Sequence, residues 1–256
     1  MIHPTAQVDA DARLGRGVEV GPYSIIGPGV EIGDGCVIGP HVVIRGPSRI
    51  GTENRFFQFC SIGDAPQDKK YAGEPTYLEI GDRNVFREYV TVNRGTTQDR
   101  GITRLGNDNW IMIGAHIAHD CEVGNHTIFS NNASIAGHVM VGDHAILGGF
   151  TLVHQFCKIG AHCFTAMGSV ISKDVPPYVL VSGHMAAPHG LNTEGLKRRG
   201  FSPEVLRLLR QSYKLLYKSG LPVEEAIAAI SSLDPGCPEL NYLTDFLRQA
   251  SRGIVR

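Results

Sequence analysis

The sequence contains no apolar run of the ~18 residues that a membrane-spanning helix requires. Its first residues, MIHPTAQVDADAR, lack the apolar segment of a secretory signal, so we expect an uncleaved cytoplasmic protein. The net charge is only -1, which argues against a nucleic acid as the main partner. The six cysteines form no CxxC pair and are too sparse for a disulfide scaffold. With 42% hydrophobic residues, the composition is that of an ordinary globular protein.

The dominant feature of the chain is an apolar residue at every sixth position. Stepping by six from Ile2 meets only apolar residues as far as Ile62, and glycine often follows the apolar residue. The register resumes at Ile80, shifts by one residue, and then runs from Leu105 to Ile171 with Thr165 as its only polar member. Such a regular internal repeat is the signature of a solenoid.

A period of six fits neither a helix nor a simple amphipathic strand. A short strand and a turn in each hexad, with three hexads in each triangular coil, place every apolar repeat residue inside a prism. Hexapeptide coils of this kind are known to wind left-handed, an exception to the usual right-handed crossover, so we expect a left-handed parallel β-helix in which equivalent positions recur in every third hexad. Five cysteines fall four residues after an apolar repeat residue and are interpreted as small core residues. They are Cys36, Cys60, Cys121, Cys157 and Cys163.

The repeat predicts a β-helix over residues 1–187 and a small C-terminal α-helical domain over residues 188–256. Two polar segments, 63–79 and 93–104, leave the repeat and are expected to form loops, which often carry function. The prolines in DVPPYV are expected to end the solenoid near this segment. The first long helix is expected to begin with Ser202 as N-cap and Pro203 at the first helical position, followed by two more helices.

A group of histidines is expected near one edge of the prism. His119 and His138 are 19 residues apart, and His154 follows 16 residues later, so the three lie in successive coils separated by ~4.8 Å. His116 precedes His119 by three residues, and Asp120 follows it. The group can be an accidental surface cluster, a zinc site, or a proton-transfer site in which Asp120 orients His119. A second column is expected to be a solvated ladder and contains His126, His144 and His162.

Seven segments occur in a characteristic order: FQFCSIGDAPQDKKYAGEPT, NRGT, AHIAHDCEVGN, NNASIAGHV, VHQFCKIGAH, KDVPPYV and NTEGLKRRGFS. Together they resemble the acyl-carrier-protein-dependent UDP-N-acetylglucosamine O-acyltransferases of lipid A biosynthesis, and the similarity runs through nearly all of the chain. The related N-acyltransferase of the same pathway carries an extra N-terminal domain, for which a repeat that begins at Ile2 leaves no room. Zinc-binding hexapeptide proteins similar to γ-class carbonic anhydrases are the other alternative.

The resemblance implies a homotrimer with sites between neighbouring subunits and no metal or other cofactor. It also implies transfer of an R-3-hydroxyacyl chain from acyl carrier protein to the sugar 3-hydroxyl of UDP-N-acetylglucosamine. His119 matches the family's general base, paired with Asp120, and Gly137 matches the backbone N–H that stabilises the oxyanion. Matches to substrate contacts are Asp68, Lys70, His116, His138 and Gln155, with His154 beside it, and matches to nucleotide contacts are Asn192, Glu194 and Arg199.

A basic surface and one methionine complete the predicted site. The residues expected to bind the carrier protein are Arg198, Arg207, Arg210 and Lys214, although a solvated helix face has the same pattern. Met167 matches the residue that closes the acyl groove in the family, although methionine also fills irregular gaps. The family analogy, together with the ~0.8 kcal/mol lost for each CH₂ that cannot be buried, leads us to expect a donor of about ten carbons. An acyl-enzyme on Cys121 is disfavoured by its inward repeat position.

Overall fold

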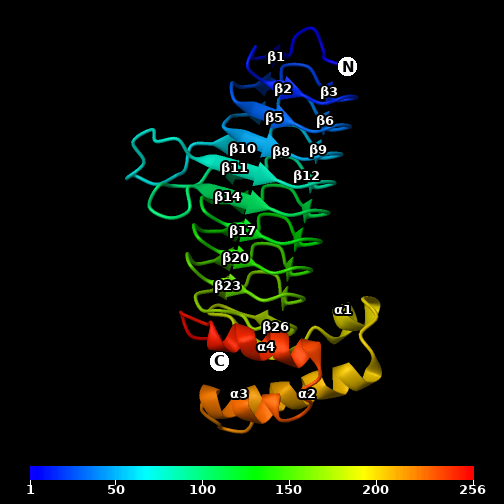
Figure 1. The fold of residues 1–256 in the computed structure, drawn as a ribbon, viewed down its shortest axis with the longest axis vertical. Helices are drawn as coiled ribbons and strands as arrows, with labels where there is room; N and C mark the ends of the chain where they lie inside the picture. Colours follow the sequence, from blue (N-terminus) through cyan, green and yellow to red (C-terminus); the bar gives the residue numbers. More distant parts are fainter.

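Short parallel strands stack into three flat faces in a computed structural model that describes residues 1–256. Successive strands belong to different faces, so every third strand pairs in register with its predecessor on the same face, as Val8 pairs with Ile26. The result is the predicted left-handed parallel β-helix, a triangular prism along whose axis the chain advances from the N-terminus at the top of Figure 1 to the helices at the bottom. We call the faces 1, 2 and 3 in the order in which the chain visits them.

Face 1 consists of β1 (Gln7–Val8), β4 (Ile25–Ile26), β7 (Val43–Ile44), β10 (Ser61–Asp64), β13 (Thr91–Asn93), β16 (His116–Ile117), β19 (Ser134–Ile135), β22 (Leu152–Val153) and β25 (Val170–Ile171). Face 2 consists of β2 (Arg13–Leu14), β5 (Val30–Ile32), β8 (Ser48–Ile50), β11 (Tyr77–Ile80), β14 (Ile102–Leu105), β17 (Glu122–Val123), β20 (Met140–Val141) and β23 (Lys158–Ile159). Face 3 consists of β3 (Glu19–Val20), β6 (Val37–Ile38), β9 (Arg55–Phe56), β12 (Val85–Phe86), β15 (Trp110–Ile111), β18 (Ile128–Phe129), β21 (Ile146–Leu147), β24 (Phe164–Thr165), β26 (Val179–Ser182) and β27 (Ala187–Leu191).

The apolar repeat residues fill the interior of the prism. Ile44, Ile62 and Ile117 expose none of their surface, and the five repeat cysteines are buried with them as the sequence predicts. Thr165, which interrupts the repeat, is also fully buried, and its hydroxyl lies 2.7 Å from that of Thr151. A polar group at a core position is thus satisfied by a hydrogen bond within the core.

Two long segments replace turns at the edge between faces 1 and 2. Residues 65–76 connect β10 to β11, and residues 94–101 connect β13 to β14. In Figure 1 both segments project from the same side of the β-helix. They are shorter than the predicted loops 63–79 and 93–104, because the end residues of each predicted loop belong to paired strands.

Four helices follow the β-helix: α1 (Thr193–Arg198), α2 (Pro203–Tyr217), α3 (Val223–Ser231) and α4 (Pro238–Arg248). The Ser202 side chain accepts a hydrogen bond from the N–H of Val205, as expected for an N-cap. Past the prolines of DVPPYV, β26 still pairs in parallel with β24, and β27, which begins at Ala187, pairs antiparallel with β26, so sheet structure continues past the expected end of the β-helix. The short helix α1 was not expected from the sequence. No helix combines the length and apolar character of a membrane span.

Candidate active site

Three successive turns at the edge between faces 1 and 2 carry the predicted catalytic residues. These turns follow β16, β19 and β22, and each spans four residues: 118–121, 136–139 and 154–157. Because the coils are in register, His119 is equivalent to Gly137 and Gln155 in the next two coils. Asp120 is likewise equivalent to His138. The repeat therefore brings together side chains that are one full coil apart in sequence.

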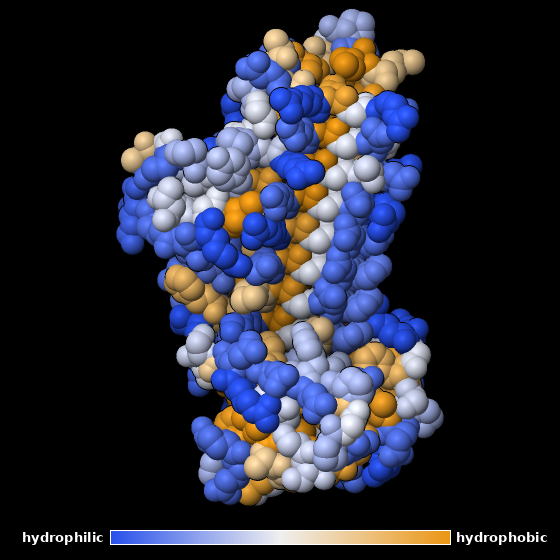
Figure 2. Space-filling view, in the orientation of Figure 1, coloured by the Kyte–Doolittle hydropathy of each residue, from blue (hydrophilic) through white to orange (hydrophobic).

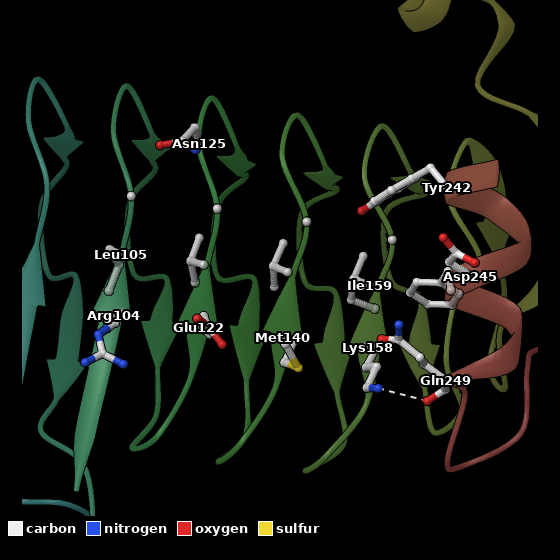
Figure 3. Close-up of a pocket in the computed structure, with 17 residues that line it drawn as sticks. Arg104, Leu105, Glu122, Asn125, Met140, Lys158, Ile159, Tyr242, Asp245 and Gln249 are labelled. Atoms are coloured by element: carbon white, nitrogen blue, oxygen red, sulfur yellow. Dashed lines mark hydrogen bonds between the residues drawn. The ribbon is translucent and has the colours of Figure 1, made fainter. Parts of the chain in front are cut away.

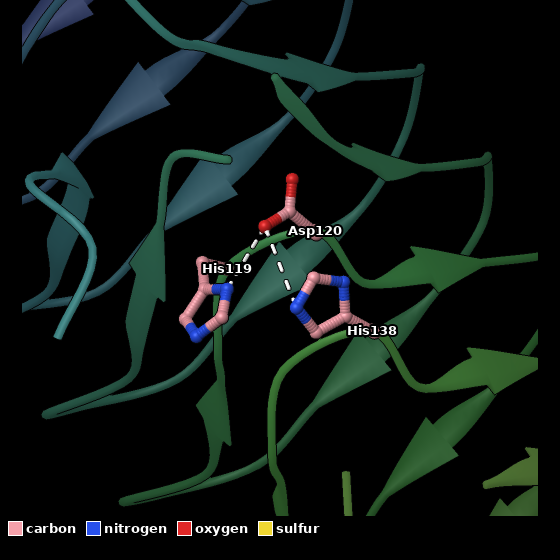
Figure 4. Close-up of side chains that lie close together, drawn as sticks. All are labelled: His119, Asp120 and His138. Atoms are coloured by element: carbon pink, nitrogen blue, oxygen red, sulfur yellow. Dashed lines mark hydrogen bonds and ion pairs between the residues drawn. The ribbon is translucent and has the colours of Figure 1, made fainter. Parts of the chain in front are cut away.

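His119 is held by its neighbour Asp120. Its Nδ1 lies 2.9 Å from Oδ2 of Asp120, and its side chain is 14% exposed (Figure 4). A carboxylate only accepts hydrogen bonds, so the proton of a neutral imidazole must be on Nδ1 in this arrangement. The Nε2 atom is then left with a free lone pair and can accept a proton.

Asp120 is fully buried and receives several hydrogen bonds. The backbone N–H of Thr96 lies 2.9 and 3.0 Å from its two carboxylate oxygens, and the Thr96 hydroxyl donates to Oδ2 at 2.6 Å. Burial by itself raises the pKa of Asp120, but the hydrogen bonds from His119 and Thr96 outweigh it, and the net shift is downward. Asp120 is therefore an ionised carboxylate that fixes the orientation of His119.

Gly137 lies directly beneath the His119 ring. A Cβ atom at Gly137 would lie 2.7 Å from Nε2 of His119 and closer still to Cε1. The N–H of Gly137 makes no hydrogen bond within the chain. Only glycine leaves room for the ring at this position, and it also presents an unpaired N–H beside it.

His138 lies next to the pair and has its own carboxylate partner. Its Nδ1 lies 2.8 Å from Oδ2 of Asp99, and its ring stacks on Phe156 with centroids 4.3 Å apart. Its Nε2 lies 4.0 Å from Oδ2 of Asp120, and its ring meets that of His119 edge-on at 5.1 Å. In Figure 4 both imidazoles face the Asp120 carboxylate.

A polar hollow of about 790 Å³ opens in front of these rings. Its walls come from both long segments and from the turns of three successive coils. The lining residues are Gln67, Asp68, Lys69, Lys70, Gln98, Asp99, His119, His138, Gln155 and Phe156. The structure thus brings Asp68, Lys70, His138 and Gln155 together with His119 at the hollow. Asp120 and Gly137 do not line the hollow but contact the His119 ring, Asp120 at Nδ1 and Gly137 beside Cε1 and Nε2.

Two of the histidines predicted to contact the substrate, His116 and His154, do not line this hollow. His116 is in strand β16 on face 1, where its Nδ1 lies 2.7 Å from the hydroxyl of Thr91. Burial, followed by the proximity of His119, lowers the pKa of His116, so it is neutral near pH 7. His154 is on the same edge as His119 but is exposed, and its Nδ1 contacts only the carbonyl of Gln155.

The predicted nucleotide-binding residues are on the edge between faces 2 and 3. Asn192 caps α1 and donates a hydrogen bond to the carbonyl of His162 at 3.0 Å. Arg199 follows α1 and contacts Nδ1 of His144. Glu194 is exposed and paired with Lys197. The histidine column predicted as a solvated ladder is stacked with ring centroids 4.8 Å apart, but its members His144 and His162 are partly covered by the helical domain.

Met167 is on the third edge, between faces 3 and 1. It is 78% exposed, so it fills no gap within the chain. The predicted carrier-binding residues Arg198, Arg210 and Lys214 are also exposed and form no ion pair within the chain, whereas Arg207 is paired with Glu204. A single chain therefore does not bring Met167 or the predicted nucleotide contacts to the hollow at His119.

A second hollow, of about 630 Å³, lies on face 2 against α4 (Figure 3). Its floor consists of apolar repeat residues and a column of glycines. In Figure 2 an orange stripe of apolar residues and a white stripe beside it run along this face. Its charged side chains have partners within the chain: Arg104 with Glu79, and Lys158 with the carbonyl of Gln249. It contains none of the predicted site residues and no imidazole.

The cluster His119, Asp120 and His138 has the residue types of a metal site. One ligand atom from each lies within 4.8 Å of the others. The hydrogen bonds described above already occupy Nδ1 of His119 and both oxygens of Asp120. The Nε2 atoms of His119 and His138 have no hydrogen-bond partner within the chain, whereas a metal bound to Asp120 would compete with its contacts to Thr96 and His119.

Sequence reasoning missed Thr96, Asp99 and Phe156. Phe156 follows His138 by one full coil, so the repeat already placed it in the same column. Thr96 and Asp99 belong to a segment outside the repeat, for which the period predicts no position. Their polar character within NRGTTQDR was the only signal.

The comparisons with known proteins point to one family. A model described as UDP N-acetylglucosamine O-acyltransferase, domain 2, matches residues 174–255, and one for six bacterial transferase hexapeptide repeats matches residues 1–46 and 102–137. The acyl-(acyl-carrier-protein)–UDP-N-acetylglucosamine O-acyltransferase of Thiobacillus denitrificans is 60% identical over 255 residues, which cover 100% of this chain and 99% of that one.

Two solved structures agree over the full length. LpxA from Acinetobacter baumannii is 49% identical with a TM-score of 0.98, and 100% of this chain and 99% of that chain are covered. The UDP-N-acetylglucosamine O-acyltransferase of Moraxella catarrhalis is 46% identical with a TM-score of 0.97 and the same coverage. Identity at this level extends through both the β-helix and the helices.

Proposed function

The chain belongs to the UDP-N-acetylglucosamine O-acyltransferase family, and we propose on this basis that it transfers an R-3-hydroxyacyl chain from acyl carrier protein to the 3-hydroxyl of UDP-N-acetylglucosamine, the first step of lipid A biosynthesis. The observation that carries the mechanism is the pair formed by His119 and the buried Asp120 at the wall of a polar hollow. The donor is a thioester that is already activated, so the step requires no metal.

In the proposed reaction His119 acts as the general base. A sugar hydroxyl is a poor nucleophile near neutral pH, and Nε2 of His119 takes its proton while the oxygen attacks the thioester carbonyl. Asp120 stabilises the imidazolium that forms. Such a base contributes about 10²- to 10⁴-fold to a rate.

Attack on the thioester creates a negatively charged oxygen, for which Gly137 supplies a donor. Its N–H has no partner within the chain and adjoins the His119 ring. Loss of one such donor typically costs ~3 kcal/mol of transition-state stabilisation. The intermediate then collapses with departure of the carrier-protein thiol, which takes the proton from His119.

We place transfer directly between donor and acceptor, with no acyl-enzyme. Cys121 exposes 1% of its surface, and its thiol points into the core toward the carbonyl of Ala136 at 3.1 Å. Burial raises the pKa of this thiol to about 12, so it carries no thiolate near neutral pH. Neither substrate reaches it.

The distribution of the predicted contacts supports a homotrimer. His119, the nucleotide contact Arg199 and the acyl-groove residue Met167 lie on three different edges of one prism. In a trimer of parallel prisms, a cleft between two chains is lined by different edges of the two neighbours. Residues that are separated in one chain can then meet a single pair of substrates.

The carrier protein is proposed to bind the exposed cations of helices α1 and α2, which are Arg198, Arg207, Arg210 and Lys214, because carrier proteins of this kind are acidic and opposite charges steer association. By analogy with the family, Met167 is proposed to end the acyl groove at about ten carbons, and the loss of ~0.8 kcal/mol per unburied CH₂ would disfavour longer chains.

The test is a transfer assay with purified protein, UDP-N-acetylglucosamine and acyl carrier protein loaded with 3-hydroxyacyl chains of different length. The native chain should transfer the acyl group, His119→Ala should lose at least about 100-fold in kcat, and metal chelators should change neither. Stoichiometric zinc that is removed together with activity would instead establish a zinc enzyme built on His119, Asp120 and His138.

A further inference from the structure

Residues 94–101 form a fixed segment that covers the catalytic pair. The N–H of Gly101 donates to the carbonyl of Thr96 at 3.0 Å and closes the segment on itself. A Cβ at Gly95 would lie 2.6 Å from Cα of Ile102, so the two ends of the segment are in direct contact. Arg94 reaches back from its start and donates to the hydroxyl of Tyr71 at 3.2 Å.

Thr96 supplies every hydrogen bond that the Asp120 carboxylate receives apart from the one with His119. Its N–H and its hydroxyl both donate, at 2.9, 3.0 and 2.6 Å. Thr96 is 1% exposed and Asp120 is fully buried, so water has no access to replace a lost donor. Without the hydroxyl, Oδ2 of Asp120 would keep only its longer contacts with the Thr96 N–H and with His119, at 3.0 and 2.9 Å, so the carboxylate would be held less firmly behind the ring.

Asp99 contacts the imidazole of His138 in the way that Asp120 contacts the imidazole of His119. Its Oδ2 accepts from Nδ1 of His138 at 2.8 Å, while Phe156 stacks on the ring. The ring is therefore fixed at its edge and on one face. The next residue, Arg100, is anchored to β17 through Glu122 at 2.6 Å, which holds this end of the segment in place.

We propose that residues 94–101 are a positioning strap for the active site, in which Thr96 holds Asp120 behind His119 and Asp99 orients His138. The inference rests on the proposed function, in which His119 is the general base and His138 contacts the substrate. Thr96 acts through Asp120 on the proton-transfer step. Asp99 acts through His138 on the binding of the acceptor.

The two residues should therefore affect different kinetic constants. Thr96→Val removes the hydroxyl donor at nearly constant volume and should lower kcat by about tenfold or more, with little change in KM, while Thr96→Ser keeps the donor and should restore most of the rate. Asp99→Ala should raise KM for UDP-N-acetylglucosamine by about tenfold with a smaller effect on kcat. Asp99→Asn retains an acceptor oxygen for Nδ1 and should recover part of that affinity.

Thr97→Val is the matched control, because Thr97 belongs to the same segment but is exposed and makes no side-chain hydrogen bond. It should behave like the native protein. If Thr96→Val matches Thr97→Val, or if Thr96→Ser is as slow as Thr96→Val, Thr96 does not position the pair. If Asp99→Ala leaves KM unchanged, Asp99 does not orient His138 for binding.

His119→Ala, measured beside these variants, distinguishes a failure of the proposed mechanism from a failure of the positioning strap alone. An active His119→Ala protein overturns the proposed mechanism. An inactive His119→Ala protein together with a fully active Thr96→Val protein overturns the strap alone. In thermal unfolding, the exposed Asp99→Ala variant should match the native chain and Thr96→Val should remain folded at the assay temperature, so their kinetic changes report on positioning.

Discussion

Gly137→Ala should inactivate the protein without removing any catalytic group. The added Cβ would lie 2.7 Å from Nε2 of His119, whereas ordinary contacts between such atoms are about 3.5–4.0 Å. The imidazole must therefore move by about 1 Å, and displacements of that size can cost about 100-fold in rate. The Gly137 N–H survives the substitution, so the loss is assigned to the position of the base.

The fold should tolerate this change. Gly137 does not adopt a positive φ, so an alanine there meets no backbone strain. The atoms that it contacts belong to a side chain that can rotate away. The free energy of unfolding of the Gly137→Ala protein should stay within about 1 kcal/mol of the native value, since a Gly→Ala exchange at a compatible backbone conformation has effects of that size.

Gly27→Ala provides the matched control. Gly27 is in a turn on the same edge, but the nearest atom to its added Cβ is the Ile44 carbonyl oxygen at 3.5 Å, an ordinary contact. The assay is acyl transfer at saturating donor and acceptor, with thermal unfolding of each variant measured in parallel. A Gly137→Ala protein that is as active as Gly27→Ala would show that the His119 position in this structure is not the catalytic one.

Three further predictions concern the other edges and the helical domain. Reversing the charges of Arg198, Arg210 and Lys214 should raise KM for the carrier-protein donor and weaken the dependence of that KM on salt, while KM for UDP-N-acetylglucosamine stays unchanged. Unaltered donor kinetics would show that these cations are a solvated helix face and do not bind the carrier protein. Met167→Gly should shift the preference toward longer 3-hydroxyacyl donors in a competition assay, and an unchanged length profile would show that Met167 does not end the groove. Burial, with contributions from the His144 and Arg199 charges, lowers the pKa of His162 from 6.5 to about 4. As the pH falls, the unfolded chain therefore binds a proton at His162 before the folded chain does. The contribution of neutral His162 to the free energy of unfolding is fully present above pH 6.5 and is lost as the pH falls toward 4. Urea unfolding at several pH values should show a smaller decline for His162→Phe, which keeps the ring beside Tyr178, and an equal decline would assign the effect to other groups.

The sequence was sufficient to predict the β-helix because a single period controls both burial and position. One apolar residue in six must face the interior, and this requirement gives the faces, the coil of three hexads and the burial of the repeat cysteines. Even Thr165 follows the pattern, since Thr151 satisfies its hydroxyl within the core. The same period is enough to place His119 and His138 on one edge from the sequence alone.

The remaining parts of the site do not follow the period. Thr96 and Asp99 come from a segment whose path depends on hydrogen bonds to residues far along the chain, such as Asp120 and His138. Helix α1 has six residues, too few for a helical period to be recognised. The separation of Met167 from His119 also required the structure, because it depends on which edge each turn occupies.

The turn geometry at the site is the ordinary geometry of the prism. Asp120 and His138 have φ values of 58° and 64°, which would suggest strain if they were considered alone. The equivalent turn residues on the edge between faces 2 and 3 have the same conformation, with φ values of 55° at His126 and 61° at His144. Positive φ is therefore a property of the repeat and not a device of the active site. What distinguishes the edge between faces 1 and 2 is that Thr96 donates hydrogen bonds to Asp120 and so fixes an ionised carboxylate behind a histidine.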